Sequence, residues 1–300
     1  MTALSICVTT YNRADLLRRL LESIEESCLS EIEIIITDDG SRDKTRSTVD
    51  EYRERSGATI RYIWQENAGR ATALWNAIMS ATGDYTIIMD SDDYFIAGGL
   101  KRILEEVQKL SENTGCSSSF CGIAFGVVLR RGDKDLLSLP PAIAYSNFIA
   151  IRADHGVSTD LKEVVRTRIL QENLYVVPPG CRRVPTSSLW VRIADQYDCL
   201  CVPEPIAVKE YLDGGMTSNI LSLKTKDALP VEAVFRKLSK SRRYKSKLYR
   251  LKANVQKHRF AFHCSMPRFE KYSDLFFMPA GLLIYMSDKL RLAAKALIRR

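Results

Sequence analysis

Three carboxylates directly follow a short apolar segment of this chain. The run Tyr85–Met89 has a β-branched centre, which predicts a buried strand, and it stops at Asp90, Asp92 and Asp93. Three like charges so close together repel one another and need a compensating cation. An Asp-x-Asp pair after a strand offers oxygen ligands of the kind that Mg²⁺ or Mn²⁺ prefers, and leaves positions for phosphate oxygens. The alternative is a solvated acidic turn that caps the next helix.

Polar residues also end the neighbouring predicted strands. Apolar runs at 4–9, 33–37 and 59–64 alternate with segments of helical pattern, which predicts a mostly parallel sheet covered by helices. In such sheets, ligands bind beyond the carboxyl ends of the strands. The residues at these ends are Thr9, Tyr11, Asp38, Asp39, Asn67 and Arg70. This convergence favours a functional acidic site over a set of unrelated helix caps.

Two residues are predicted to cap helices in this half of the chain. Asn12 precedes leucines at helical spacing, so we expect it to be the N-cap of a helix that reaches Ile24. Ser41 is expected to cap a charged helix that runs to about Arg55.

Length and composition limit the class of protein. With 300 residues and 46% hydrophobic content, the chain can form one α/β domain with an extension or two small domains. The eight cysteines have no Cys-x-x-Cys spacing, so we expect reduced core residues of a cytosolic protein. The start runs directly into a strand, and no signal peptide is expected. Neither a Gly-x-Gly-x-x-Gly fingerprint after the first strand nor a P-loop is present.

Three blocks of sequence resemble the family 2 glycosyltransferases. They are Val8–Arg13, Ile36–Thr45 and Asp90–Asp93, and the resemblance covers about residues 3–110. A weaker match, at Ser188–Ala194 and Val202–Pro205, is similar to the later half of bacterial enzymes that build surface polysaccharides. The resemblance implies an inverting enzyme of the GT-A fold that uses a nucleotide-diphospho-sugar. We therefore expect a nucleotide-sugar-binding half at 1–110, an acceptor-binding half at 111–225 and a helical tail at 226–300.

The resemblance also implies roles for individual residues. Thr9 and Tyr11 would line the base pocket, although Tyr11 could instead pack on the first helix. Asp39 would accept a hydrogen bond from uracil N3–H, whereas the neighbouring Asp38 is expected to stabilise the loop. Arg70 would bind the diphosphate or the ribose, and Asp90 would bind the ribose. Asp92 would ligate Mn²⁺ or Mg²⁺, and Asp93 would either contact the site or cap the next helix.

The position of the family's catalytic base holds a residue that cannot do this chemistry. Counted back from Arg192, the position is Thr186, and threonine is not a general base near neutral pH. Three interpretations remain open. Asp160 or Glu172 supplies the carboxylate, the transition state is so dissociative that no strong base is needed, or the chain binds nucleotide-sugars without turnover. No catalytic residue is assigned.

The tail differs from the body in charge. Residues 231–300 contain 18 Lys and Arg against 4 Asp and Glu, whereas the remainder holds 26 against 32. The apolar run at 276–286 is shorter than the ~20 residues of a transmembrane helix. The final helix has two faces, one with Leu283, Met286, Leu290, Ala293 and Leu297, and one with Arg291, Lys295 and Arg299. This pattern is typical of a helix that lies on an anionic membrane surface, and the alternative is a helix packed on the catalytic domain.

The sequence thus predicts an inverting, metal-dependent glycosyltransferase. The expected donor is a UDP-sugar, and the expected acceptor is a glycan or a lipid-linked sugar. We expect a cytoplasmic protein, peripheral to the inner face of the cell membrane through its tail, and no nucleic-acid partner, because the basic residues come with apolar anchors. A non-catalytic nucleotide-sugar-binding scaffold is the alternative that Thr186 supports. A sugar nucleotidyltransferase would need a Gly-rich loop after the first strand, where residues 9–12 are not one.

Overall fold

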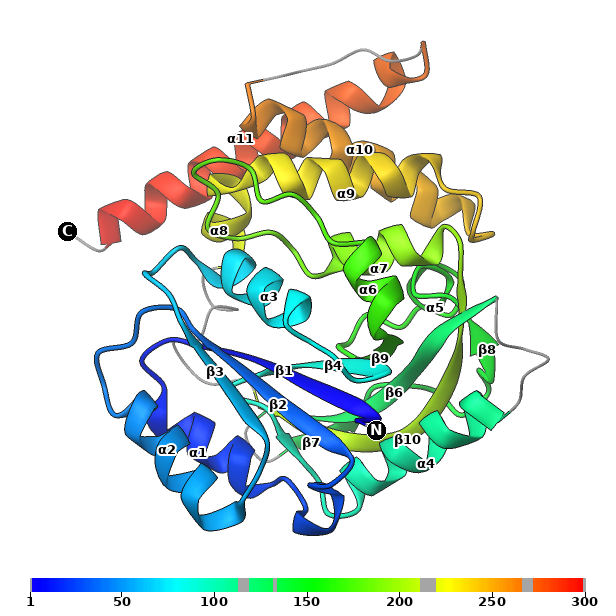
Figure 1. Cartoon of the computed structure of the whole chain (residues 1–300). Coiled ribbons are helices and arrows are strands. Elements are labelled where there is room, and N and C mark those ends of the chain that lie inside the picture. The colour runs from blue at the N-terminus through cyan, green and yellow to red at the C-terminus, as the bar shows by residue number, and fades with distance from the viewer. Residues whose placement is uncertain (1, 113–118, 132–133, 211–219, 266–271, 299–300) are drawn as a thin grey trace.

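The computed structural model describes residues 2–112, 119–131, 134–210, 220–265 and 272–298. Its ten strands belong to one mixed sheet, in the order β3-β2-β1-β4-β9-β6-β10-β5, with β7 beside β6 and β8 beside β10 (Figure 1). The strands are β1 Leu4–Thr10, β2 Ile32–Asp38, β3 Ile60–Trp64, β4 Tyr85–Asp90, β5 Tyr94–Phe95, β6 Phe120–Arg131, β7 Lys134–Leu137, β8 Tyr145–Ser146, β9 Lys162–Arg166 and β10 Asp198–Glu210.

Register brings the polar ends of the first strands together. Strands β3, β2, β1 and β4 are parallel, and Thr9 of β1 lies opposite both Thr37 of β2 and Asp90 of β4. Strand β9 runs antiparallel between β4 and β6, so it enters the sheet beside the acidic strand. The predicted α/β class with a mostly parallel, helix-covered sheet is confirmed.

Helices cover both faces of the sheet because both faces of its central strands are apolar. One face packs against α1 Ala14–Glu22, α2 Thr45–Ser56 and α4 Gly99–Glu112, and the other against α3 Arg70–Met79, α5 Ala150–Ala153, α6 Thr167–Glu172 and α7 Ser187–Ala194. A short 3₁₀ turn, η1, spans Glu26–Cys28. Successive residues of a strand point to opposite faces, so Ile6 and Val8 join the first core and Cys7 the second. The resulting burial on both sides fixes the register that positions the strand ends.

Neither predicted helix cap is found. Helix α1 follows Arg13, and Asn12 instead has a positive φ of 50° and accepts a hydrogen bond from the backbone N–H of Arg42. Helix α2 begins at Thr45, after Lys44, while the Ser41 hydroxyl accepts from the backbone N–H of Asn12. Both predicted caps therefore tie two loops together, a long-range pairing that local sequence patterns do not reveal.

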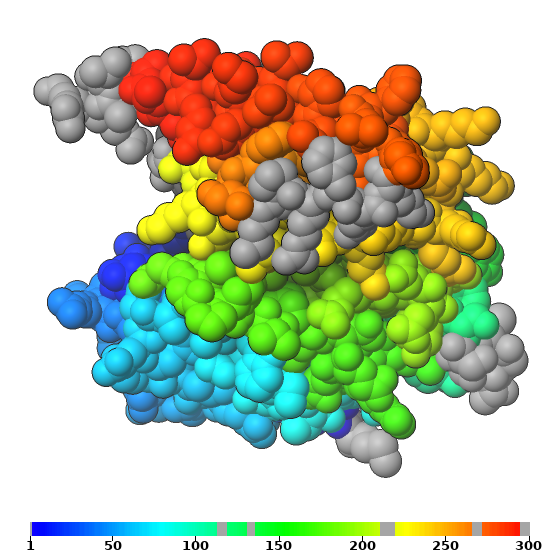
Figure 2. Space-filling model, turned by 90° about the horizontal axis from the view of Figure 1, so that it is seen from above, coloured from blue at the N-terminus to red at the C-terminus, as the bar shows by residue number. Residues whose placement is uncertain are grey.

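The C-terminal helices form a separate layer beside the sheet. They are α8 Ile220–Lys226, α9 Ala228–Lys240, α10 Lys247–His263 and α11 Asp274–Ile298. Helix α9 packs on the second core through Val234 and Leu238, and α10 lies between α9 and α11. In the space-filling view these helices form a band along one side of the molecule, with α11 outermost (Figure 2). No helix in the described ranges is long and apolar enough to cross a membrane.

Helix α11 turns a charged face inward. Asp274, Gly281 and Asp288 recur every seven residues and are buried against α10. Asp274 accepts from Lys257 at 2.8 Å, and Asp288 accepts from Arg259 at 2.7 and 2.8 Å. The apolar residues Leu283, Met286 and Leu290 point the other way, with 68%, 54% and 72% of their surface exposed. The predicted apolar stripe is thus not packed on the catalytic domain at these positions, and the side chains of Lys295, Leu297 and Arg299 lie outside the described residues.

Candidate active site

A cavity of about 850 Å³ opens at the carboxyl ends of β1 and β4. Ligand pockets for small molecules are typically about 300–1,000 Å³, so a nucleotide-sized ligand can be accommodated. Nine residues singled out from the sequence line this one cavity: Thr9, Tyr11, Asp39, Asn67, Arg70, Asp90, Asp92, Asp160 and Thr186. Glu172 is not among its lining residues. It is the last residue of α6 and pairs with Arg168 at the surface.

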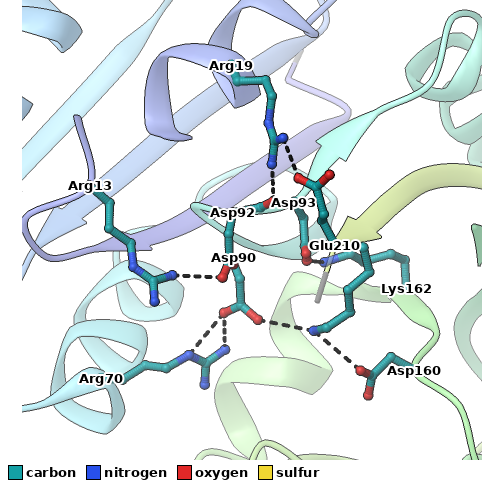
Figure 3. Close-up of polar contacts among 10 residues, drawn as sticks. Arg13, Arg19, Arg70, Asp90, Asp92, Asp93, Asp160, Lys162 and Glu210 are labelled. Atoms are coloured by element: carbon teal, nitrogen blue, oxygen red, sulfur yellow. Dashed lines mark hydrogen bonds and ion pairs between the residues drawn. The ribbon is translucent and has the colours of Figure 1, made fainter. Parts of the chain in front are cut away.

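Each carboxylate of the acidic turn is paired with a cation of the chain (Figure 3). Asp92 accepts from Arg13 at 2.8 Å, and the buried Asp93 pairs with the buried Lys162 at 2.5 Å. Asp90 accepts from the Nε of Arg70 at 3.0 Å and lies 3.5 Å from the Nζ of Lys209. Four cations from four different segments therefore hold the turn, and the solvated acidic turn considered above is excluded.

These cations decide the protonation of Asp90. Burial acts to raise its pKa, but Arg70 and Lys209 together lower it well below the usual range. Asp90 is therefore ionised and a very weak base at neutral pH. The pKa of Lys209 is shifted in the opposite direction: burial lowers it, but Asp90 and Asp93 raise it well above its ordinary value.

The carboxylate of Asp39 organises the loop that leads into α3. It accepts from Gln65 at 2.8 Å, from the backbone N–H of Ala68 at 2.8 Å and from that of Gly69 at 2.9 Å. Gly69 has φ 95°, and a Cβ there would lie 2.3 Å from the carbonyl oxygen of Arg182. Only glycine fits this position, because both the positive φ and the close backbone exclude a side chain.

Thr9 and Tyr11 lie at the cavity, whereas Asp38 lies beneath the neighbouring loop. Tyr11 is 47% exposed at the cavity wall, and Thr9 is buried beside Asp90 at the end of β1. Asp38 lies under the loop, where it accepts from the backbone N–H of Ser41 and from the Tyr62 hydroxyl.

Thr186 lies in the cavity, and its hydroxyl is already engaged. The Nη1 of Arg70 donates to Thr186 Oγ1 at 3.1 Å, so Arg70 bridges this residue and Asp90. Asp160 lies at the other side of Asp90, 3.5 Å from Lys209 Nζ.

Sequence reasoning missed several residues of the site. Cations from the later half line the cavity, among them Arg182, Arg183 and Lys224. The Nη1 of Arg183 is buried and has no hydrogen-bond partner among the described residues. Burial, with help from Arg183, lowers the pKa of Lys224. The clustered Arg182-Arg183 pair next to Pro185 was a visible signal of basic character, but nothing in the sequence placed it opposite the acidic turn.

Glu163 was also missed. It lies on β9, lines the cavity and is only 8% exposed. Burial, its largest influence, raises its pKa to about 7, and Arg152 and Lys162 offset only part of that effect. In the sequence, the available signal of this site was that two charged residues, Lys162 and Glu163, begin the short strand β9.

The Asp92 carboxylate suits a divalent cation that is also bound by phosphate oxygens of a ligand. Within the described ranges, no three His, Cys, Asp or Glu side chains form a group that could hold a metal. Asp92 faces the cavity with 24% of its side chain exposed, and only one of its oxygens receives a hydrogen bond from Arg13. Mg²⁺ and similar ions are often held by one or two carboxylates together with substrate phosphates and water. The residues present fit such a site.

Comparison with known proteins adds the family. Residues 5–127 match the model of "Glycosyl transferase family 2". This part of the chain is a family 2 glycosyltransferase domain. The predicted resemblance is therefore confirmed, and the matched residues include β1, the acidic turn and most of β6.

Curated relatives of this glycosyltransferase domain come from several bacteria. An uncharacterized glycosyltransferase of Nostoc sp. is 34% identical over 105 residues, which are 35% of this chain and 33% of the relative. A GalNAc(5)-diNAcBac-PP-undecaprenol β-1,3-glucosyltransferase of Campylobacter jejuni is 30% identical over 111 residues, 36% of each chain. The match thus spans about a third of the length of these relatives.

Solved structures support the GT-A fold over nearly the whole length of the chain. TarS 1–349 of S. aureus, in complex with UDP-GlcNAc, has a TM-score of 0.63 and 15% identity, with 95% of this chain and 81% of that chain covered. A mannosyltransferase of Pyrobaculum calidifontis, in complex with GDP-Man and Mn²⁺, has a TM-score of 0.52 and 17% identity, covering 98% and 79%. At this level of identity the likeness establishes the fold, and the predicted GT-A-like architecture is confirmed.

Proposed function

We propose that this protein transfers a sugar, with inversion, from a nucleotide-diphospho-sugar to an acceptor hydroxyl. The observation that supports this function best is the cavity at the strand ends. It is lined by the acidic turn and by cations from both halves of the chain. Eight of its lining residues are Lys or Arg and six are Asp or Glu. This surplus of positive charge suits a diphosphate, whose negative charge grows as the sugar leaves.

We assign residues of the cavity wall to the base, the ribose and the diphosphate of the donor. Tyr11, exposed at the cavity wall, would stack on the base, and the second oxygen of Asp39 would accept from uracil N3–H. This supports a UDP-sugar as the donor. Asp90 would accept from a ribose hydroxyl once Arg70 turns from it to the diphosphate. Arg183, which has an unpartnered buried Nη1, is a second group for the same phosphates.

Asp92 is the residue that would hold Mn²⁺ or Mg²⁺. When bound, such an ion neutralises charge on the departing diphosphate. Arg13 orients the Asp92 carboxylate through its hydrogen bond, and it is released to the phosphates when the ligand arrives. The Mn²⁺ named with the mannosyltransferase of the same fold supports this use.

The acceptor side of the cavity comes from residues 111–225. Arg152 and Ser158 supply polar groups there, and the largely buried Trp190 also lines the cavity. We propose a glycan or lipid-linked sugar as the acceptor, in surface polysaccharide synthesis. The undecaprenol-linked acceptor in the name of the Campylobacter jejuni relative supports this class.

The test is release of nucleotide from a panel of UDP- and GDP-sugars with Mn²⁺, with and without bacterial lipid extract. We expect slow hydrolysis of one UDP-sugar, accelerated by the extract, and loss of that turnover in Arg70→Ala. Thr186 at the family's base position favours the alternative of a non-catalytic binding protein. Tight nucleotide binding without turnover under every condition would support that alternative and reject the transferase.

The exposed apolar stripe of α11 supports attachment to an anionic membrane surface. In a surface helix of a soluble protein the apolar stripe normally faces inward, but here ion pairs occupy the inner face and Leu283, Met286 and Leu290 face outward. The exposed Lys289 and Arg291 flank this stripe, and residues 231–300 carry a large excess of positive charge. This combination matches an interfacial helix on anionic lipid. We propose that the protein works at the cytoplasmic face of the cell membrane.

Cosedimentation with vesicles containing phosphatidylglycerol tests this attachment. We expect the double variant Leu283→Glu, Leu290→Glu to lose binding at least tenfold, because two charges would enter the apolar layer. Leu136→Glu, at an equally exposed leucine on β7, is the matched control and should bind as the wild type does. Equal binding of all three proteins would exclude the stripe as the membrane contact.

A further inference from the structure

The cavity contains six carboxylates, and most of them are held by other groups. Asp39 accepts three hydrogen bonds from the loop, and Asp90 and Asp92 are bound by Arg70 and Arg13. Glu210 accepts from Arg19 at 2.5 Å, and Asp160 lies near Lys209. Each of these five carboxylates therefore already has a partner within the chain.

Glu163 differs from these five. In the described part of the chain, no ion pair and no hydrogen bond from another residue holds its carboxylate, although the residue is buried. Glu163 lines the cavity, and neither of its carboxylate oxygens is a sealed polar atom without a hydrogen-bond partner. A buried carboxylate without a partner is costly, and this supports a functional reason for its presence.

The sheet places Glu163 beside the donor site. Strand β9 is the neighbour of β4, and Val164 lies opposite Ile87. Side chains alternate along a strand, so Glu163 shares a face of the sheet with Val165 and, on β4, with Ile88 and Asp90. Ile88 and Asp90 line the same cavity. Glu163 therefore lies next to the ribose side of the donor pocket, on the side of the residues that we assign to the acceptor.

We propose that Glu163 is the catalytic base that accepts the proton of the acceptor hydroxyl, in place of the residue that Thr186 replaces. This inference rests on the proposed transferase function. As the acceptor oxygen bonds to the anomeric carbon, the bond from that carbon to the phosphate oxygen breaks. Its electron pair leaves with the nucleoside diphosphate, and the acceptor proton moves to Glu163, which later releases it to solvent.

The protonation behaviour of Glu163 suits this role. A general base is most effective when its pKa lies near the working pH. With a pKa raised by burial to about 7, Glu163 is a far stronger base than Asp90 and is still ionised in part of the molecules at neutral pH. The rate should therefore rise with pH through about 7.

The variants Glu163→Gln and Glu163→Asp test the proposal, measured as sugar transfer or donor hydrolysis across pH 5–9. We expect Glu163→Gln to lower kcat by about 10²–10⁴-fold, with the donor KM changed less than threefold, and to remove the rise near pH 7. Glu163→Asp should recover part of the rate with an altered pH profile. Glu172→Gln, at the surface carboxylate that pairs with Arg168, is the matched control and should behave as the wild type.

Nucleotide binding and thermal unfolding of each variant separate loss of the base from loss of the fold. A Glu163→Gln protein that binds nucleotide but retains kcat within threefold would overturn the proposal. So would a rate loss found in Asp160→Asn and not in Glu163→Gln. A wild-type protein that binds nucleotide-sugar and never turns it over would overturn the transferase function itself, and this inference with it.

Discussion

In this cavity the pairing of a side chain, more than its type, decides its chemistry. Asp90 is half-buried and Glu163 is buried, on neighbouring strands, yet the pKa of Asp90 is lowered by Arg70 and Lys209 and that of Glu163 is raised by burial. The sequence predicted Asp39, Asp90 and Asp92 because they follow strands in recognisable blocks. Glu163 could not be predicted, since its partners, or their absence, depend on the tertiary contacts of β9.

The raised pKa of Glu163 predicts a stability cost above neutral pH. In the unfolded chain a glutamate has a pKa of 4.5, so the folded protein holds this proton more tightly and loses stability as pH rises from 4.5 to about 7. The difference corresponds to about 3 kcal/mol. We therefore expect Glu163→Gln to raise the free energy of unfolding by about 1–3 kcal/mol at pH 8, and by little at pH 4. Urea unfolding at both pH values measures this, and equal stabilisation at both would contradict the assigned pKa.

At the scale of elements, the first four strands were predictable and the loop geometry was not. The apolar runs at 4–9 and 85–89 closely match β1 and β4, because buried parallel strands have continuous apolar sequence. Asn12 and Ser41 were assigned to the wrong role, since each bonds to the other loop. The loop before α3, held by Asp39, is where a small change should have the largest effect on the site.

Gly69→Ala tests how rigidly this loop must be held. Its Cβ would meet the backbone of Arg182, so we expect a loss of about 2–3 kcal/mol in unfolding free energy and at least tenfold weaker nucleotide binding. Gly57→Ala is the matched control, because Gly57 also has a positive φ, 67°, but no atom lies within 4 Å of its Cβ position. That variant should lose about 1 kcal/mol and bind nucleotide normally. Similar binding by both variants would mean that the loop adapts.

For the whole molecule, the tail is a helical layer whose buried surface is unusually charged. The sequence predicted a two-faced final helix, but it could not predict which face would point inward. Lys257 and His258 meet Asp274, and Arg259 and His263 meet Asp288, so polar contacts help to hold α11 on α10. Tyr285 of α11 adds ring contacts to α10. The packing of α11 on α10 should therefore depend on the protonation of these two histidines.

Acidification should loosen this layer first. Burial lowers the pKa of both His258 and His263 below the unfolded value of 6.5, so the unfolded state gains protons first and stability falls as pH drops below 6.5. We expect amide exchange in α11, corrected for intrinsic rates, to accelerate several-fold between pH 7.5 and 5.5, while α4 changes little. An α11 that is equally protected at both pH values would contradict this account of how the layer is held.

The central claim is that one cavity binds a nucleotide diphosphate together with a divalent cation at Asp92. Calorimetric titration of UDP into the protein, with and without Mn²⁺, tests it most directly in wild type and Asp92→Asn. We predict that Mn²⁺ tightens UDP binding at least tenfold in the wild type, and that Asp92→Asn abolishes this gain but still binds UDP weakly through Asp39 and the cavity cations. Binding of UDP that is unaffected by Mn²⁺, or equally improved by it in Asp92→Asn, would contradict the account.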